Sequence, residues 1–270
     1  MNLEHTYVSI NLPISLCIPT KNRYDSFLNR YVEQYIRYLD NMIISEIIIC
    51  DEDGGDYNKF LNNQIYKPYI CNGKLKIFKN ERILGVFENK LKVVSLSNNE
   101  FVALIDSDNF CDESYFTTVR EYIINNKQSL SKHIILAPSR GKPNFDFTQY
   151  SGEIITTKNL GLFFNRSDYG VLLNTGNYVL TKSIVNNIKY HRSQEILTKI
   201  SACDVMYFIL LAFQQFTDFE FHIIKDLSYD HSLHDDSEYI KTNEMCKHFR
   251  EKILKPQYIQ LWHKYKQTNQ

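Results

Sequence analysis

The sequence has 270 residues, and its 31 basic and 31 acidic side chains give a formal net charge of zero. That balance provides no overall basic field to attract nucleic acid or an anionic membrane, so we expect no nucleic-acid partner. Apolar residues make up 43% and charged residues 23%, as in ordinary globular domains. No run approaches the roughly 20 apolar residues that span a bilayer, so no transmembrane segment is expected.

Six cysteines are present, and they form neither a CxxC pair nor a ligand-like spacing with histidine. Such a use of cysteine is typical of a reducing compartment. The opening residues, MNLEHTYVSINLP, lack the basic start and apolar core of a signal peptide. We therefore expect a cytoplasmic protein, at most peripheral to a membrane. The sequence does not indicate its oligomeric state.

The first half of the chain alternates strand and helix patterns. Short apolar runs that end in polar turns predict strands at 14–18, 46–50, 74–78 and 101–105. Apolar residues at helical spacing predict helices at 27–40, 85–98 and 113–126. This alternation predicts parallel crossover units in an α/β layer.

The second half is less regular. Strands are predicted at 133–137 and 221–225, and a largely buried helix at 203–216. Residues 138–158 are predicted to be a loop. The tail, 244–266, is predicted to be a helix that is interrupted at Pro256 and docked on the body by Trp262. No repeat or low-complexity linker is present, which favours a single domain.

Polar and acidic residues follow three of the predicted strands. IPTKNR ends the first strand, CDEDGGD the second and IDSDN the fourth. Because ligands bind beyond the carboxyl ends of parallel strands, where the connecting loops meet, these segments should lie together. Turn chemistry accounts for some polarity there, but this much acid at two successive strand ends favours a site for a metal ion and phosphate.

Asp106 and Asp108 stand one residue apart, directly after the apolar run FVALI. Two carboxylates so close repel each other unless a cation lies between them or water solvates them. They are therefore interpreted either as a polar turn or as oxygen ligands of a metal ion. A calcium loop of the EF-hand type is excluded, because Cys111 stands where that loop needs glycine and Thr117 where it needs glutamate.

Three segments in this order, ISLCIPTKNR, EIIICDEDGGD and ALIDSDN, resemble the nucleotide-binding half of inverting family-2 glycosyltransferases of the GT-A type. The resemblance covers most of residues 14–112 and, more loosely, 174–239. It implies a GT-A, Rossmann-like α/β fold with a mostly parallel central sheet flanked by helices. The chain would then be one domain, 1–270, with a nucleotide-sugar-binding half at 1–112 and a less regular acceptor half with a C-terminal helix at 113–270.

The same resemblance implies an activity. The chain would transfer a sugar from a nucleotide-sugar, most readily a UDP-sugar, to a hydroxyl group, with inversion at the sugar carbon. The acceptor would be a glycan, a protein or a lipid-linked molecule. Mn²⁺ or Mg²⁺ would be the cofactor, since a divalent ion that bridges both phosphates stabilises the charge on the leaving diphosphate.

The resemblance also implies donor contacts at single positions. Asp51 matches an aspartate that accepts a hydrogen bond from uracil, and Asp53 competes with it, because Asp51-Glu52-Asp53 replaces the two adjacent aspartates common in the family. NERILGVFENK, at 80–90, lacks the arginine of the family's corresponding helix, so Asn89 and Lys90 are the substitutes. The expected donor contacts are Pro19, Thr20, Asn22, Arg23, Asp51, Asp53, Asn89, Lys90, Asp106 and Ser107.

Asp106-Ser107-Asp108 matches the family's DxD motif. Asp108 would ligate the metal ion, and Asp106 would hold the ribose or a metal-bound water. In YDHSLHDDSEY, at 229–239, His234 loosely matches a histidine that returns to the active site as a third metal ligand or a diphosphate contact. A surface turn rich in histidine and aspartate is the alternative for this stretch.

An inverting transfer needs a base that takes the proton from the attacking hydroxyl. Asp204, in ISACDVMYFILLAF, lies about a hundred residues after the DxD motif, where similar enzymes place their base. Ser201 and Asp204 also have the spacing of a capping box, so Asp204 could instead stabilise a helix N-terminus. Asn174, Gly176 and Asn177 match the acceptor side, with a plain turn before a strand as the alternative.

Two other functions remain open. A sugar-phosphate nucleotidyltransferase has a similar layered sheet, but it needs a glycine-rich loop after the first strand, and IPTKNRYDS contains no glycine. A nucleotide- or sugar-binding module without turnover would keep the fold alone. The presence of Asp106, Asp108 and Asp204 favours an enzyme.

Overall fold

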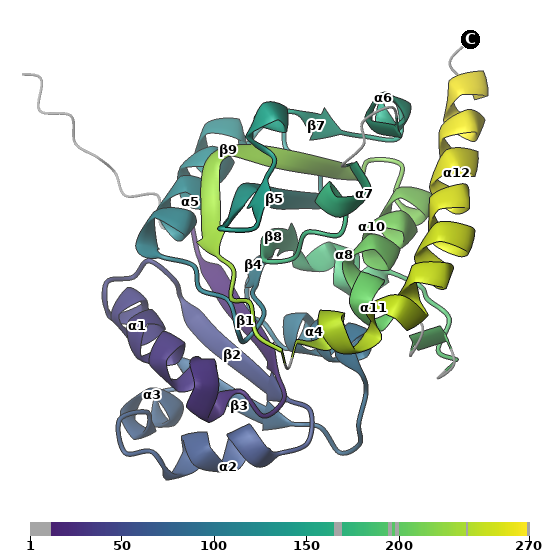
Figure 1. Cartoon of the computed structure of the whole chain (residues 1–270). Coiled ribbons are helices and arrows are strands. Elements are labelled where there is room, and N and C mark those ends of the chain that lie inside the picture. The colour runs from purple at the N-terminus through teal and green to yellow at the C-terminus, as the bar shows by residue number, and fades with distance from the viewer. Residues whose placement is uncertain (1–11, 165–168, 194–195, 198–199, 236, 269–270) are drawn as a thin grey trace, which may run out of the picture.

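The computed structural model describes residues 12–164, 169–193, 196–197, 200–235 and 237–268. Its centre is one nine-stranded mixed sheet, in which eight strands follow the order β3-β2-β1-β4-β8-β5-β9-β7 and β6 pairs with β5 (Figure 1). The strands are β1 (Ile14–Thr20), β2 (Glu46–Asp51), β3 (Leu75–Lys79), β4 (Phe101–Leu104), β5 (Ile134–Lys142), β6 (Phe145–Asp146), β7 (Ile154–Ile155), β8 (Tyr178–Thr181) and β9 (Glu220–Asp230).

The first four strands pair in parallel, as the sequence predicts. Every residue of β1 and β2 is buried, because helices cover both faces of this part of the sheet. Side chains alternate between the faces: Ile14, Leu16 and Ile18 pack in one apolar cluster, whereas Cys17 packs in the other. These strands are continuous apolar runs in the sequence because both of their faces are buried.

Helices of the first half lie on opposite faces of the sheet (Figure 1). The apolar sides of α1 (Asn29–Asp40) and α5 (Glu113–Asn126) contribute to one cluster. The other cluster contains residues of α4 (Val86–Ser95), α8 (Lys182–Asn187) and α10 (Asp204–Gln215). Two short helices follow β2, α2 (Gly55–Asn62) and α3 (Lys67–Cys71). None of the helices described here is long and apolar enough to cross a membrane.

The second half departs from the sequence prediction in the tract after residue 137 and at the end of β9. The predicted loop 138–158 is wrong in part: β5 continues to Lys142, and β6 and β7 lie in the same tract. Strand β9 continues to Asp230, five residues past its predicted end at 225. The physical reason is pairing, since β5 and β9 run parallel to each other up to Lys142 and Asp230. Pairing between β5 and β9 thus extends both strands beyond the apolar residues that predict them.

The tail forms α11 (Glu238–Phe249), a π-helical turn (Arg250–Leu254) and α12 (Lys255–Thr268). The break therefore comes before Pro256, which lies in the first turn of α12, where a missing backbone N–H does no harm. Helix α12 lies along α10 and close to α6 (Leu160–Phe164) (Figure 1). Trp262 docks it, since its indole lies directly over the Cα of Gly161.

Gly161→Ala should loosen α12. A Cβ at Gly161 would lie 1.8 Å from Nε1 of Trp262, far inside van der Waals contact, so the indole must move. We expect a lower melting temperature and a red shift of the fluorescence of Trp262, the single tryptophan of the chain. Gly170→Ala is the matched control, because the Cβ there would meet only Cε of Lys255, at an ordinary 3.7 Å. An unchanged emission spectrum in Gly161→Ala would contradict this docking.

Candidate active site

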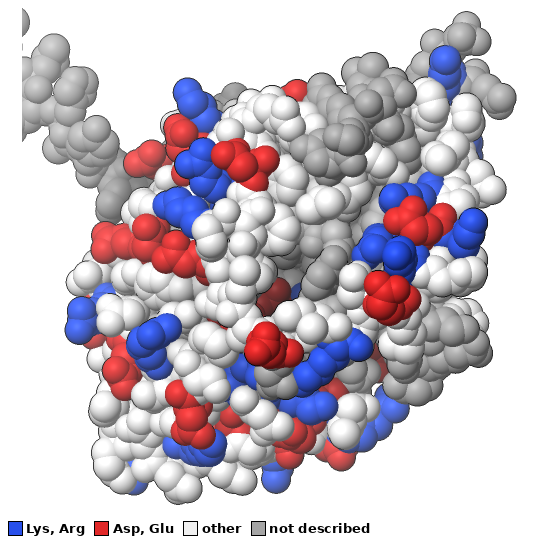
Figure 2. Space-filling view, in the orientation of Figure 1, with Lys and Arg blue, Asp and Glu red and all other residues white. Residues whose placement is uncertain are grey.

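A cavity of about 820 Å³ opens at the carboxyl edge of the parallel strands. Figure 2 shows it as a hollow near the middle of that face, with acid at its floor. Its size falls within the range of ligand pockets, roughly 300–1,000 Å³. The lining includes loop residues 19–23 and 106–109, the start of α4, residues 169–171 and 174–177, the start of α10, segment 231–234, part of α11, and Arg250, Glu251 and Lys255.

The loop after β1 is held in place by one buried carboxylate. Asp56, in the first turn of α2, accepts hydrogen bonds from Oγ1 of Thr20 at 2.6 Å and from the backbone N–H groups of Arg23 at 2.9 Å and Tyr24 at 3.0 Å. Pro19, Thr20, Asn22 and Arg23 line the cavity, as the sequence predicts for donor contacts. Asp56 thus orders the turn without facing the cavity itself.

The loop after β2 presents a residue that the sequence analysis did not select. Asp51 is fully buried and accepts the backbone N–H of Tyr57 at 2.8 Å, while Asp53 accepts Nδ2 of Asn22 at 3.1 Å. Neither of them lines the cavity; Glu52 does. Burial raises the pKa of Asp51. No local signal distinguishes Glu52, because it is the middle one of three acidic residues in a row.

Glu52 and Asn89 belong to one buried hydrogen-bond network. Nδ2 of Asn80 donates to Oε2 of Glu52 at 2.8 Å and to Oδ1 of Asn89 at 2.9 Å, and Oε1 of Glu52 accepts the backbone N–H of Gly85 at 2.6 Å. Nδ2 of Asn89 donates to the backbone carbonyl of Cys50 at 3.2 Å. The amide of Asn89 therefore joins α4 to β2, although part of the residue reaches the cavity.

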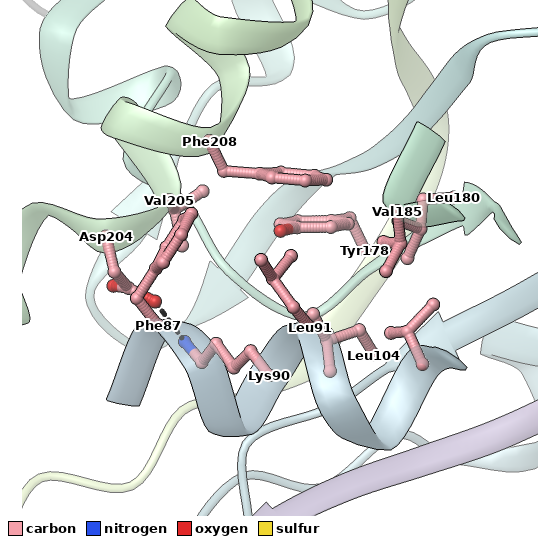
Figure 3. A pocket seen from close by; sticks show the side chains of 11 residues that line it. Phe87, Lys90, Leu91, Leu104, Tyr178, Leu180, Val185, Asp204, Val205 and Phe208 are labelled. Carbon is pink, nitrogen blue, oxygen red and sulfur yellow. Dashed lines mark ion pairs between the residues drawn. The ribbon is translucent and has the colours of Figure 1, made fainter. Parts of the chain in front are cut away.

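Lys90 lies between two carboxylates of the cavity floor. Its Nζ is 3.0 Å from Oδ1 of Asp106 and 3.0 Å from Oδ2 of Asp204. Figure 3 shows the Lys90 side chain reaching from α4 towards Asp204 on α10. Burial by itself would lower the pKa of Lys90, but Asp106 and Asp204 together raise it well above the ordinary value. The ammonium group is therefore charged throughout the physiological pH range.

Asp204 does not cap its helix in the way that a capping box requires. The N-cap of α10 is Cys203, which makes no side-chain capping bond, and Oδ1 of Asn174 accepts the backbone N–H of Met206 at 3.2 Å instead. Burial raises the pKa of Asp204, and Lys90 opposes that shift only in part. A carboxylate with a raised pKa is a stronger base, so the environment of Asp204 suits proton abstraction.

The three predicted acceptor residues all line the cavity and also hold the acidic groups in place. Nδ2 of Asn174 donates to the backbone carbonyl of Ala202 at 3.2 Å, next to the start of α10. Oδ1 of Asn177 accepts the backbone N–H of Asp106 at 2.8 Å, and a Cβ at Gly176 would lie 3.2 Å from Oδ2 of Asp106. These contacts fix the DxD motif and the helix that carries Asp204.

Asp108 meets His234 across the cavity. Nε2 of His234 lies 2.9 Å from Oδ2 of Asp108, and Ser107 lines the cavity between the two aspartates. The returning segment is anchored because the backbone N–H of Ser232 donates to Oδ1 of Asn109 at 3.0 Å. Nδ1 of His231 is buried and has no hydrogen-bond partner among the described residues. This segment is therefore part of the cavity wall, although the side chain of Leu233 points to solvent.

The residues at this end of the cavity fit a hard divalent ion that shares its ligands with a diphosphate. Mg²⁺ and Mn²⁺ prefer oxygen, accept imidazole, and are commonly bound through one or two carboxylates plus substrate phosphates. Asp108 and His234 offer one carboxylate and one imidazole in contact with each other, and Asp106 lines the same cavity two residues before Asp108. Among the described residues there is no compact group of three such ligands, so a diphosphate would have to complete the coordination.

Comparison with known proteins gives the family. The model of "Glycosyl transferase family 2" matches residues 15–175, more than half of the chain. No curated protein sequence matches. Among solved structures, S. aureus TarS is similar with a TM-score of 0.58 and 13% identity over 94% of this chain, which spans 43% of the length of TarS.

Two further structures have the same fold. TarS 1-349 in complex with UDP-GlcNAc has a TM-score of 0.60 and 14% identity, covering 94% of this chain and 71% of that one. Glucosyl-3-phosphoglycerate synthase from Mycobacterium tuberculosis, with Mn²⁺, UDP and phosphoglyceric acid, has a TM-score of 0.50 and 12% identity, covering 83% of this chain and 72% of that one. With the family model and this shared fold, the chain belongs to glycosyl transferase family 2 and has the GT-A fold.

Proposed function

We propose that this protein moves a sugar from a UDP-sugar to an acceptor hydroxyl, with a divalent metal ion and with inversion at the sugar carbon. The observation that carries the proposal is the arrangement of acids in one cavity. Asp108 pairs with His234 at one point, and Asp106 and Asp204 share Lys90 at another. The cavity thus offers one group that would bind a metal–diphosphate and another that would accept a proton.

At the donor end, Asp108 and His234, with Asp106 beside them, would hold Mn²⁺ or Mg²⁺. Such an ion supplies a Lewis acid that stabilises the negative charge of the leaving diphosphate. Two structures of similar fold support this choice of donor and ion, since TarS 1-349 is in complex with UDP-GlcNAc and the mycobacterial synthase with Mn²⁺ and UDP. Thr20, Arg23 and Glu52 are among the cavity residues at the ends of the first two strands, where the nucleotide would lie.

At the acceptor end, Asp204 would take the proton as the acceptor oxygen attacks the sugar carbon on the side opposite the leaving diphosphate. One displacement of this kind inverts the configuration at that carbon. The raised pKa of Asp204 favours this role, and so does its place at the cavity wall. The cavity is large enough to bind an acceptor beside the donor, because it lies in the upper part of the usual range for ligand sites.

The two alternative functions fit less well. A nucleotidyltransferase would need a glycine-rich phosphate loop after the first strand, and residues 19–23 contain no glycine. Membership of glycosyl transferase family 2 also favours glycosyl transfer. A binding module without turnover would not need a proton acceptor at the cavity wall, where Asp204 lies.

Thermal unfolding with nucleotides tests the donor. UDP, GDP, CMP and ATP are each added with and without Mn²⁺, and the melting temperature is measured, because a ligand that binds only the native state raises it. We expect the largest increase with UDP, and only when Mn²⁺ is present. A GDP-selective increase would keep the mechanism and change the donor. No increase with any nucleotide would refute the nucleotide-sugar site.

A further inference from the structure

Lys90 joins two acidic residues that come from distant parts of the chain. Asp106 follows β4, Asp204 begins α10, and Lys90 lies on α4 between them in space. The ammonium group is 3.0 Å from each carboxylate, and the Lys90 side chain is only 12% exposed. Lys90 thus bridges two carboxylates of the protein itself, which is a different role from the nucleotide contact expected from the sequence.

The bridge faces the cavity on one side and apolar side chains on another. A recess of about 10 Å³ lies beside it, lined by Phe87, Leu91, Val205 and Phe208 among others (Figure 3). That space is at the lower limit of what one water molecule needs. The side chains of Lys90 and Asp204 are only 12% and 10% exposed, so water screens this pair less than a surface pair, and loss of one partner would leave the other charge largely buried and uncompensated.

Asp106 provides a fixed point for the bridge. Asn177 accepts its backbone N–H at 2.8 Å, and Gly176 packs against its carboxylate closely enough that a Cβ would lie 3.2 Å from Oδ2. The carboxylate can therefore shift little towards that side. Lys90 transmits this fixed position to Asp204, at the start of α10.

We propose that Lys90 is a positioning residue, which holds the base Asp204 at a set distance from Asp106 and thereby aligns the proton acceptor with the bound donor. The inference rests on the proposed function, since it takes Asp204 to be the base. Alignment of this kind matters because a displacement of about 1 Å in an active site can cost roughly 100-fold in rate.

Replacement with chemical rescue tests the proposal. The rate is measured as UDP released, with Mn²⁺, from the UDP-sugar that gives the largest thermal shift, and the affinity for UDP is measured separately. In Lys90→Ala we expect a kcat that is lower by about 100-fold and a UDP affinity that is within about twofold of the original. Ethylammonium, which fits the space left by the side chain, should restore at least a tenth of the lost rate, whereas the larger tetramethylammonium should not.

Lys76→Ala is the matched control, because Lys76 also pairs with a buried carboxylate, that of Glu46 at 2.6 Å, but neither residue lines the cavity. It should keep its kcat and show no response to ethylammonium. A lower UDP affinity with an unchanged kcat in Lys90→Ala would make Lys90 a donor contact and overturn the proposal. A loss of rate that ethylammonium does not restore would overturn it as well.

A double-mutant cycle covers the case in which Lys90→Ala does not fold. The melting temperatures of Lys90→Met, Asp204→Asn and the double variant are compared, and we expect the two effects to be strongly non-additive, since each removes the same ion pair. Additive effects on the melting temperature would show that Lys90 and Asp204 are not coupled and would overturn the proposal. If the proposed function itself is wrong, the original protein will release no UDP from any UDP-sugar. That outcome differs from a negative result of the rescue experiment or of the double-mutant cycle.

Discussion

Asp204→Asn should lower kcat by about 10²–10⁴-fold and leave the affinity for UDP nearly unchanged. Asparagine has the same shape as aspartate but cannot accept a proton from the attacking hydroxyl at neutral pH. The donor end of the cavity keeps its own acids, Asp106 and Asp108, so nucleotide binding should persist. The measurement is steady-state transfer or donor hydrolysis, with UDP binding by calorimetry on the same preparation.

Measuring both the rate and the affinity for UDP provides the control for this substitution. A folding defect would lower UDP affinity and rate together, whereas loss of the base lowers the rate alone. A further control is the melting temperature with UDP and Mn²⁺, which should rise in Asp204→Asn as it does in the original protein. Transfer at the original rate in Asp204→Asn would remove Asp204 from the mechanism and leave it as the structural partner of Lys90.

Asp108→Ala should abolish the Mn²⁺-dependent part of UDP binding. Removing this carboxylate also leaves His234 without its 2.9 Å partner, so two of the three candidate metal ligands are affected. We expect the dissociation constant for UDP in Mn²⁺ to increase at least tenfold, since even indirect partners of a metal ligand typically contribute about 10–100-fold. The melting-temperature increase with UDP and Mn²⁺ should disappear in the variant.

Asp235→Ala provides the comparison for Asp108→Ala. Asp235 is an exposed carboxylate next to His234 in the chain and does not line the cavity. It should bind UDP and Mn²⁺ like the original protein, which would separate metal ligation from a general loss of negative charge. If Asp108→Ala bound UDP with unchanged Mn²⁺ dependence, Asp106 and Asp108 would be an ordinary turn after β4.

Local signals in the sequence predict the parallel part of the sheet well. The runs ISLCI and EIIIC end in polar loops, and both features depend only on neighbouring residues. Strand β8 and the ends of β5 and β9 are different, because they are specified by pairing with strands far away in the sequence. Strand β8, Tyr178–Thr181, has only four residues, which are too few to show a strand pattern of apolar and polar residues by themselves.

The candidate site shows the same division. Asp106, Asp108, Asp204 and His234 were selected from the sequence by motif and spacing, and the structure brings all four to one cavity. Glu52 was not selected, because at that position the sequence offers three acidic residues in a row and does not reveal which of them turns inward. The β2–α2 turn decides this, since the backbone N–H of Tyr57 binds Asp51 and Asn22 binds Asp53.

The sequence by itself determined the α/β class and the order along the chain of the polar and acidic segments that follow the parallel strands, because each of these features is a local pattern. Only the tertiary structure decided which partners those acids have. Lys90, Asp106 and Asp204 meet because α4 and α10 pack on the same face of the sheet next to β4, and His234 reaches Asp108 because β9 ends at the same edge. Contacts between residues so far apart in the chain follow from packing, which no short stretch of sequence specifies.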